Sequence, residues 1–168
     1  MIKTKRLALD AVLAAIALLL FLVEAQIPPL TSIPGVKIGL ANAVTLFAVC
    51  FLGKKDAAAI LFVRVILGAV FAGNLSTFFY SASGAVCCYL VTCILYKPLC
   101  KTVWVLSVFG AAAHNAGQLL CACILLQSPS VFWYFPYLLI AAVISGAFTG
   151  ICVHLILRRM KNRKEKWI

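Results

Sequence analysis

The sequence predicts an all-α polytopic membrane protein, a bundle of six transmembrane helices with both termini in the cytoplasm. Of its 168 residues, 65% are hydrophobic and only 11% are charged, and the mean hydropathy is +1.11. Soluble domains are about half apolar and about a quarter charged, so much of this surface is expected to face lipid. The net charge of +11 comes from Lys and Arg clusters between apolar runs and at the two ends. This pattern indicates membrane topology and not nucleic-acid binding.

The first three spans are separated by helix-breaking and basic residues. They are expected at residues 7–27, 36–52 and 56–72. Each is close to the about 20 residues that cover the ~30 Å hydrocarbon core of a bilayer. Pro28 and Pro29 end the first span, because proline lacks the amide N–H that continues a helix. Lys54 and Lys55 close the second span, and Asp56 is expected to be the N-cap of the third.

The last three spans follow from similar boundaries. They are expected at residues 75–96, 103–126 and 133–157. Gly73 and Asn74 precede the fourth span, Pro98 follows it, and a turn at Gln127–Pro129 ends the fifth. A basic cytoplasmic tail is expected at residues 158–168, so the whole chain, 1–168, forms a single integral membrane domain in this prediction.

The loop charges predict the orientation of these spans. Cytoplasmic loops of membrane proteins collect Lys and Arg. One side of the predicted bundle holds nearly all of the basic residues: Lys3, Lys5, Arg6, Lys54, Lys55, Lys97, Lys101 and those of the tail from Arg158 to Lys166. The loops of the other side hold one, Lys37. Both termini are therefore expected inside.

Polar residues at membrane depth are the main functional signal, because each is costly in lipid and needs a partner or a task. Arg64 lies two helical turns past Asp56, too deep for a loop charge. His114 and Gln118 share a helix face at a spacing of four residues. The candidate binding residues are Lys37, Asn42, Arg64, His114, Asn115 and Gln118. The two cations predict an anionic or strongly hydrogen-bonding ligand.

Several of these polar residues also have purely structural interpretations. His114 fits either a ligand-binding role or that of a satisfied core histidine. Asp10 is expected to pair with Arg6 one turn away, and Glu24 with Lys37 across the first loop. The hydroxyls of Thr45, Ser145 and Thr149 either bond back to carbonyls of their own helices or serve a site.

No motif of soluble-type catalysis is present in the sequence. It contains no phosphate-binding loop, no HExxH, no GxSxG and no paired Asp-rich motif of the kind that holds magnesium in prenyl-transferring enzymes. We therefore expect no catalytic residue, metal ligand or cofactor, and no catalytic activity of the chain's own. The eight cysteines form no CxxC and are expected to be free. Active transport would need a separate motor, because no energy-coupling domain fits in this length.

Four segments together resemble one small bacterial membrane family, named both heptaprenyl diphosphate synthase component I and Gx transporter. They are Pro34-Gly35-Val36-Lys37-Ile38-Gly39-Leu40-Ala41-Asn42, the mid-span Arg64, His114-Asn115-x-x-Gln118, and Ser145-Gly146-x-x-Thr149-Gly150. The resemblance covers essentially the whole chain. It implies a multi-pass protein of the bacterial plasma membrane.

The size, the six expected spans and the Ala-rich first helix are also similar to the S components of energy-coupling factor (ECF) transporters. That similarity implies a subunit that binds a small molecule and docks on a T component driven by two ATPases. Ala11 and Ala15 would be the docking residues, with a gate near Pro34. The synthase name implies instead an accessory membrane subunit in menaquinone side-chain synthesis, with a prenyl diphosphate-like ligand. A purely structural membrane protein is the third interpretation.

Overall fold

The structure is a computed structural model that describes residues 2–26 and 39–160, and all regular secondary structure in this part of the chain is helical. The elements are α1 (Ile2–Gln26), α2 (Leu40–Phe51), α3 (Lys54–Ala72), α4 (Leu75–Leu99), α5 (Val103–Leu125), the 3-10 helix η1 (Pro129–Tyr134) and α6 (Phe135–Met160). The predicted all-α class is confirmed.

Four helical stretches are long and apolar enough to cross a membrane within the described residues. They are Thr4–Gln26, Leu75–Leu99, Val103–Leu125 and Pro129–Met160. The second expected span, 36–52, is helical only over the 12 residues of α2, and residues 36–38 lie outside the described part. α3 has 19 residues but carries four charged side chains. These four stretches indicate a membrane protein.

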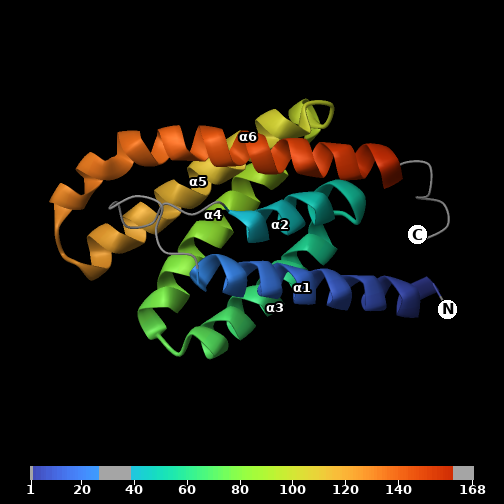
Figure 1. Cartoon of the computed structure of the whole chain (residues 1–168), viewed down its shortest axis with the longest axis horizontal. Coiled ribbons are helices and arrows are strands. Elements are labelled where there is room, and N and C mark those ends of the chain that lie inside the picture. Colours follow the sequence, from blue (N-terminus) through green and yellow to red (C-terminus); the bar gives the residue numbers. More distant parts are fainter. Residues whose placement is uncertain (1, 27–38, 161–168) are drawn as a thin grey trace.

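The helices pack in two groups that are joined by α2 and by the contact of α3 with α4. α5 lies between α4 and α6, and α1 packs against α2 and α3. Figure 1 shows α1 and α6 along opposite long sides, with α2 between them. The first turn of α1 and the last turn of α6 lie at the same end of the molecule (Figure 1).

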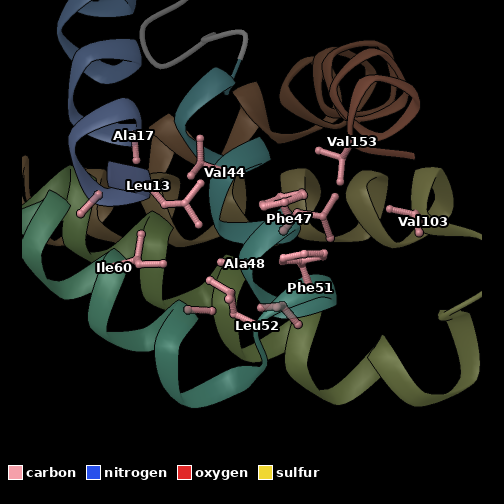
Figure 2. Close-up of a cluster of buried hydrophobic side chains, with 14 of the residues drawn as sticks. Leu13, Ala17, Val44, Phe47, Ala48, Phe51, Leu52, Ile60, Val103 and Val153 are labelled. Carbon is pink, nitrogen blue, oxygen red and sulfur yellow. The ribbon is translucent and has the colours of Figure 1, made fainter. Parts of the chain in front are cut away.

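The main apolar core surrounds α2, the most enclosed helix. Its side chains Val44, Phe47, Ala48 and Phe51 are buried, and the rings of Phe47 and Phe51 stack with centroids 5.2 Å apart. Figure 2 shows them among buried side chains of α1, α3, α5 and α6: Leu13, Ala17, Ile60, Val103 and Val153. A helix apolar on all sides is stable only when other helices or lipid surround it. α2 is therefore surrounded mainly by protein.

Two glycines allow α6 to lie very close to α5. A Cβ on Gly146 would be 2.7 Å from the Cα of Val108, and one on Gly150 would be 2.6 Å from the Cα of Trp104. Beside them, the hydroxyl of Thr149 lies 3.1 Å from that of Ser107 and donates to the Ser145 carbonyl at 2.9 Å. Of the two interpretations of Thr149, the structure forms the bond to its own helix. Small residues at four-residue spacing stabilise this pair by close packing, as is usual for helices in lipid.

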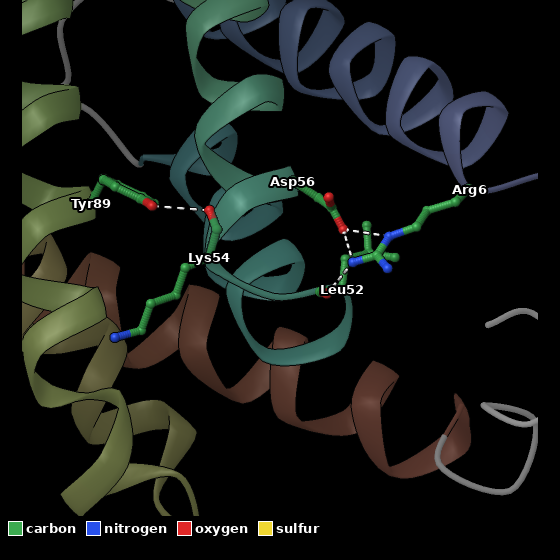
Figure 3. Close-up of polar contacts among 5 residues, drawn as sticks. All are labelled: Arg6, Leu52, Lys54, Asp56 and Tyr89. Atoms are coloured by element: carbon green, nitrogen blue, oxygen red, sulfur yellow. Dashed lines mark hydrogen bonds and ion pairs between the residues drawn. The ribbon is translucent and has the colours of Figure 1, made fainter. Parts of the chain in front are cut away.

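The expected Arg6–Asp10 pair is not the one that the structure forms. The Arg6 guanidinium binds Asp56 through Nε at 2.8 Å and through Nη2, and it also donates to the Leu52 carbonyl at 3.0 Å (Figure 3). Oδ1 of Asp10 has no hydrogen-bond partner in the described part of the chain. Arg6 pairs with Asp56 and not with Asp10 because in this position its guanidinium donates to a carboxylate and to a helix-terminal carbonyl at the same time.

The start of α3 also differs from the prediction. The N-cap is Gly53, with a φ of 116°, and Asp56 lies within the first turn of the helix. Lys54 and Lys55 are therefore part of α3, and the Lys54 carbonyl accepts a hydrogen bond from the Tyr89 hydroxyl of α4 at 2.9 Å (Figure 3). Asp56 still lies near the positive end of the helix dipole. Its carboxylate accepts hydrogen bonds from Arg6 and so joins α3 to α1.

Candidate functional site

A cavity of about 490 Å³ lies between the helices. Each α-helix of the described part contributes to its lining, as does η1. Its wall combines polar side chains with a larger apolar surface. Cavities of this size and character are typical of small-molecule sites. The helix packing therefore creates a partly open site for a small molecule.

Arg64 is the central polar residue of this cavity. It lies in the middle of α3 and is only 3% exposed. Its Nη1 donates to the Ser81 hydroxyl at 3.1 Å, and its Nη2 donates to Oδ1 of Asn42 at 3.2 Å. The guanidinium carbon lies 5.5 Å from the centroid of the Phe21 ring, a distance suited to a cation–π interaction. These partners hold the cation in place but do not neutralise it.

The first turn of α2 is held at the cavity wall by a contact with α1. Gly39, the N-cap of α2, has a φ of 76°, in the left-handed region that glycine enters most easily. Its amide donates to Oε1 of Glu24, which is 7% exposed. This contact positions Asn42 one turn further on, opposite Arg64. Lys37, the expected partner of Glu24 and a predicted binding residue, lies outside the described residues.

His114 and Gln118 of α5 both line the cavity, on the shared face that their spacing predicts. They lie over Gly84 of α4, where an added Cβ would come within 2.8 Å of the Gln118 Cγ and of the His114 Cε1. A glycine at this position therefore leaves room for both side chains. The Oε1 of Gln118 is buried and has no hydrogen-bond partner among the described residues.

Asn115 is a predicted site residue that the structure does not bring to the cavity. It is 6% exposed, and its Nδ2 donates to the Leu138 carbonyl of α6 at 2.9 Å. Successive helical residues are about 100° apart, so the face shared by His114 and Gln118 points toward α4 while Asn115 points toward α6. Through this hydrogen bond Asn115 joins α5 to α6.

The predicted docking residues lie on the outer face of α1. Ala11 and Ala15 are exposed, whereas Leu13, Ala14 and Ala17 are buried against the core. The small side chains thus form part of a smooth face that no helix of the described chain covers.

Thirteen of the 17 lining residues were not among the predicted site residues, and they include Phe21, Glu24, Tyr80 and Ser81. Glu24 carried a signal, since a carboxylate near membrane depth is costly, but it was interpreted as a partner of Lys37 across the first loop. Phe21 and Tyr80 carried no signal in the sequence, because aromatic residues are common throughout membrane helices. Ser81 is a small polar residue that is equally suited to helix packing.

Comparison with known proteins agrees with the resemblance found in the sequence. The family model for heptaprenyl diphosphate synthase component I matches residues 13–156. No curated protein and no solved structure matches the chain. Because the family match covers most of the sequence, the chain belongs to the heptaprenyl diphosphate synthase component I family.

Proposed function

We propose that this chain is the substrate-binding subunit of a membrane transporter. The observation that carries the proposal is Arg64, a buried cation held by uncharged partners in the wall of a 490 Å³ cavity. Such a cation is costly in the membrane unless a ligand or another charge compensates it. A bound molecule that accepts hydrogen bonds from the guanidinium supplies that compensation.

The energy for transport comes, in this proposal, from partner subunits similar to the T component and ATPases of ECF transporters. The sequence contains no phosphate-binding loop of its own. The exposed small residues Ala11 and Ala15 on α1 are the proposed contact with the transmembrane partner. Small residues allow two helix backbones to approach closely in lipid.

Purification of the tagged full-length chain from bacterial membranes tests this partnership. We expect a T component and ATPases to co-purify, and Ala15→Leu to reduce their recovery several-fold. Ala59→Leu, a matched change at an exposed position of α3, should leave recovery unchanged. Recovery of a prenyltransferase, with no T component and no ATPase, would contradict the transporter proposal.

We further propose that the chain crosses the bacterial plasma membrane six times, with both termini in the cytoplasm. The clustered basic residues support this orientation. The shared position of the start of α1 and the end of α6 supports an even number of crossings (Figure 1). α2 covers about 18 Å at 1.5 Å per residue, but it is enclosed by other helices and need not match the lipid thickness by itself.

Reporter fusions test the orientation. Alkaline phosphatase fused after Ser128, between α5 and η1, should be active because that turn is expected outside. The same enzyme fused after Lys166 should be inactive, while green fluorescent protein at that position should fluoresce. An active phosphatase at Lys166 would show that the C-terminus lies outside and that the number of crossings or their direction is wrong.

A second candidate function is an accessory subunit of heptaprenyl diphosphate synthase in menaquinone side-chain synthesis. The family match favours it, and so does the apolar cavity wall beside Arg64, which suits a prenyl chain. If this function is correct, adding the reconstituted chain to a catalytic prenyltransferase will change the product length or the rate. Unchanged product and rate would exclude it.

A further inference from the structure

The described lining of the cavity contains one carboxylate and one guanidinium. Glu24 and Arg64 are 7% and 3% exposed. No ion pair joins them in the described part of the chain: Glu24 accepts from the Gly39 amide, and Arg64 donates to Ser81 and Asn42. Buried ionised groups need counter-charges. The described lining of the cavity thus presents one positive and one negative site, and neither is paired with the other.

Two residues of the cavity wall each have a buried polar atom without a hydrogen-bond partner in the described part of the chain. The Nε of Arg64 is a buried donor without an acceptor, and the Oε1 of Gln118 is a buried acceptor without a donor. Both residues line the cavity. Buried polar atoms in native proteins nearly always have partners. Rotation of the two side chains toward the cavity would bring both atoms to a ligand that has an acceptor and a donor.

Most of the remaining wall surface is apolar, and the cavity volume sets the size of the ligand. Leu119, Leu126 and Leu138 line the cavity with other aliphatic residues. A volume of about 490 Å³ exceeds what a single amino acid fills and falls within the range for drug-sized ligands. The ligand therefore has an apolar body in addition to its polar groups.

We infer that the cavity binds a net-neutral zwitterion with an apolar body, about the size of a dipeptide. Its anionic group binds Arg64, and its cationic or N–H donor group binds Glu24 and Gln118. This inference rests on the proposed binding function and names its ligand class. A prenyl diphosphate fits less well, because it would bring several negative charges to one described cation and a carboxylate.

Four probes of defined charge test the ligand class with the full-length chain in lipid nanodiscs. They are L-phenylalanyl-L-leucine, its N-acetyl derivative, its C-terminal amide and geranyl diphosphate. Calorimetry or equilibrium dialysis should give at least tenfold tighter binding of the free dipeptide than of either blocked form. Tighter binding of the N-acetyl form or of geranyl diphosphate, or no binding of the free dipeptide, would overturn the inference.

The variant Glu24→Gln tests whether the Glu24 carboxylate recognises the cationic group of the ligand, as opposed to supporting the cavity in general. The glutamine oxygen can still accept from the Gly39 amide, so α2 should keep its position. We expect dipeptide affinity to fall about tenfold, while the N-acetyl derivative binds equally well or better because a negative charge has been removed. Equal weakening of both probes would contradict a role for the carboxylate in recognition. Asp10→Asn, on the same helix outside the cavity lining, should leave both affinities unchanged.

These results separate the ligand class from the function. Arg64-dependent binding of the N-acetyl derivative in preference to the dipeptide would leave a binding subunit intact and exclude only the zwitterion. Failure of all four probes, together with absence of a T component and ATPases from the purified material, would exclude the transporter function as well.

Discussion

Replacing Arg64 with alanine is expected to lower ligand affinity about 100-fold, because removal of a buried charged hydrogen-bonding partner costs about 3 kcal/mol. Arg64 is 3% exposed and lines the cavity. Mass spectrometry of small molecules retained by the purified proteins measures the effect. The wild-type chain should retain a molecule that the Arg64→Ala protein lacks.

The effect of Arg64→Ala on stability should be much smaller than its effect on binding. The substitution removes the donors to Ser81 and Asn42, but it also removes the cost of keeping a cation out of water. The melting temperature in detergent should therefore change little. A large fall in melting temperature would assign Arg64 to helix packing and would contradict a binding role as the cause of the loss.

Two further variants make the Arg64 result specific. Arg64→Lys keeps the positive charge but not the planar fork of donors, so we expect an intermediate loss of affinity. Arg159→Gln removes an exposed cation at the end of α6 and should leave ligand retention unchanged. Unchanged retention by correctly inserted Arg64→Ala protein would remove the main support for the proposed site.

Replacing Gly150 with leucine should disrupt the pair formed by α5 and α6. A Cβ at this position would lie 2.6 Å from the Cα of Trp104 and 2.7 Å from the Cβ of Ser107. The first atom belongs to the backbone, so the helices must separate to admit any side chain. Overpacking by small groups costs about 1–3 kcal/mol, and leucine should exceed the upper value.

Unfolding of the purified protein by heat and by sodium dodecyl sulfate measures the loss of stability. Gly150→Ala should be destabilised less than Gly150→Leu, because its added volume is smaller. Cys152→Leu places the same bulk on an exposed position of α6 and should behave like the wild type. Wild-type stability of Gly150→Leu would show that the two helices are not held by this close approach.

Some parts of the site could be predicted because lipid makes polar residues informative. Arg64 stood out by its depth in an apolar run, and His114 and Gln118 by their shared helix face. The structure brings these three and Asn42 to one cavity. Their selection needed only the rule that a polar group in the membrane interior requires a partner.

Other contacts could not be predicted because helices in lipid are apolar on nearly every side. The sequence does not indicate how such a helix is rotated about its axis. Rotation decides that Asn115 bonds to the Leu138 carbonyl and does not line the cavity. It also brings Phe21 beneath the guanidinium of Arg64.

The sequence by itself determined that this protein is helical and suited to a membrane, and that costly polar residues lie within its apolar runs. Hydrophobicity and charge act locally, so they can be recognised without coordinates. The tertiary structure decided which polar residues meet: Arg6 with Asp56, Glu24 with the Gly39 amide, and Arg64 with Asn42 and Ser81. Such pairs join residues far apart in the chain, and their geometry exists only after the helices have packed.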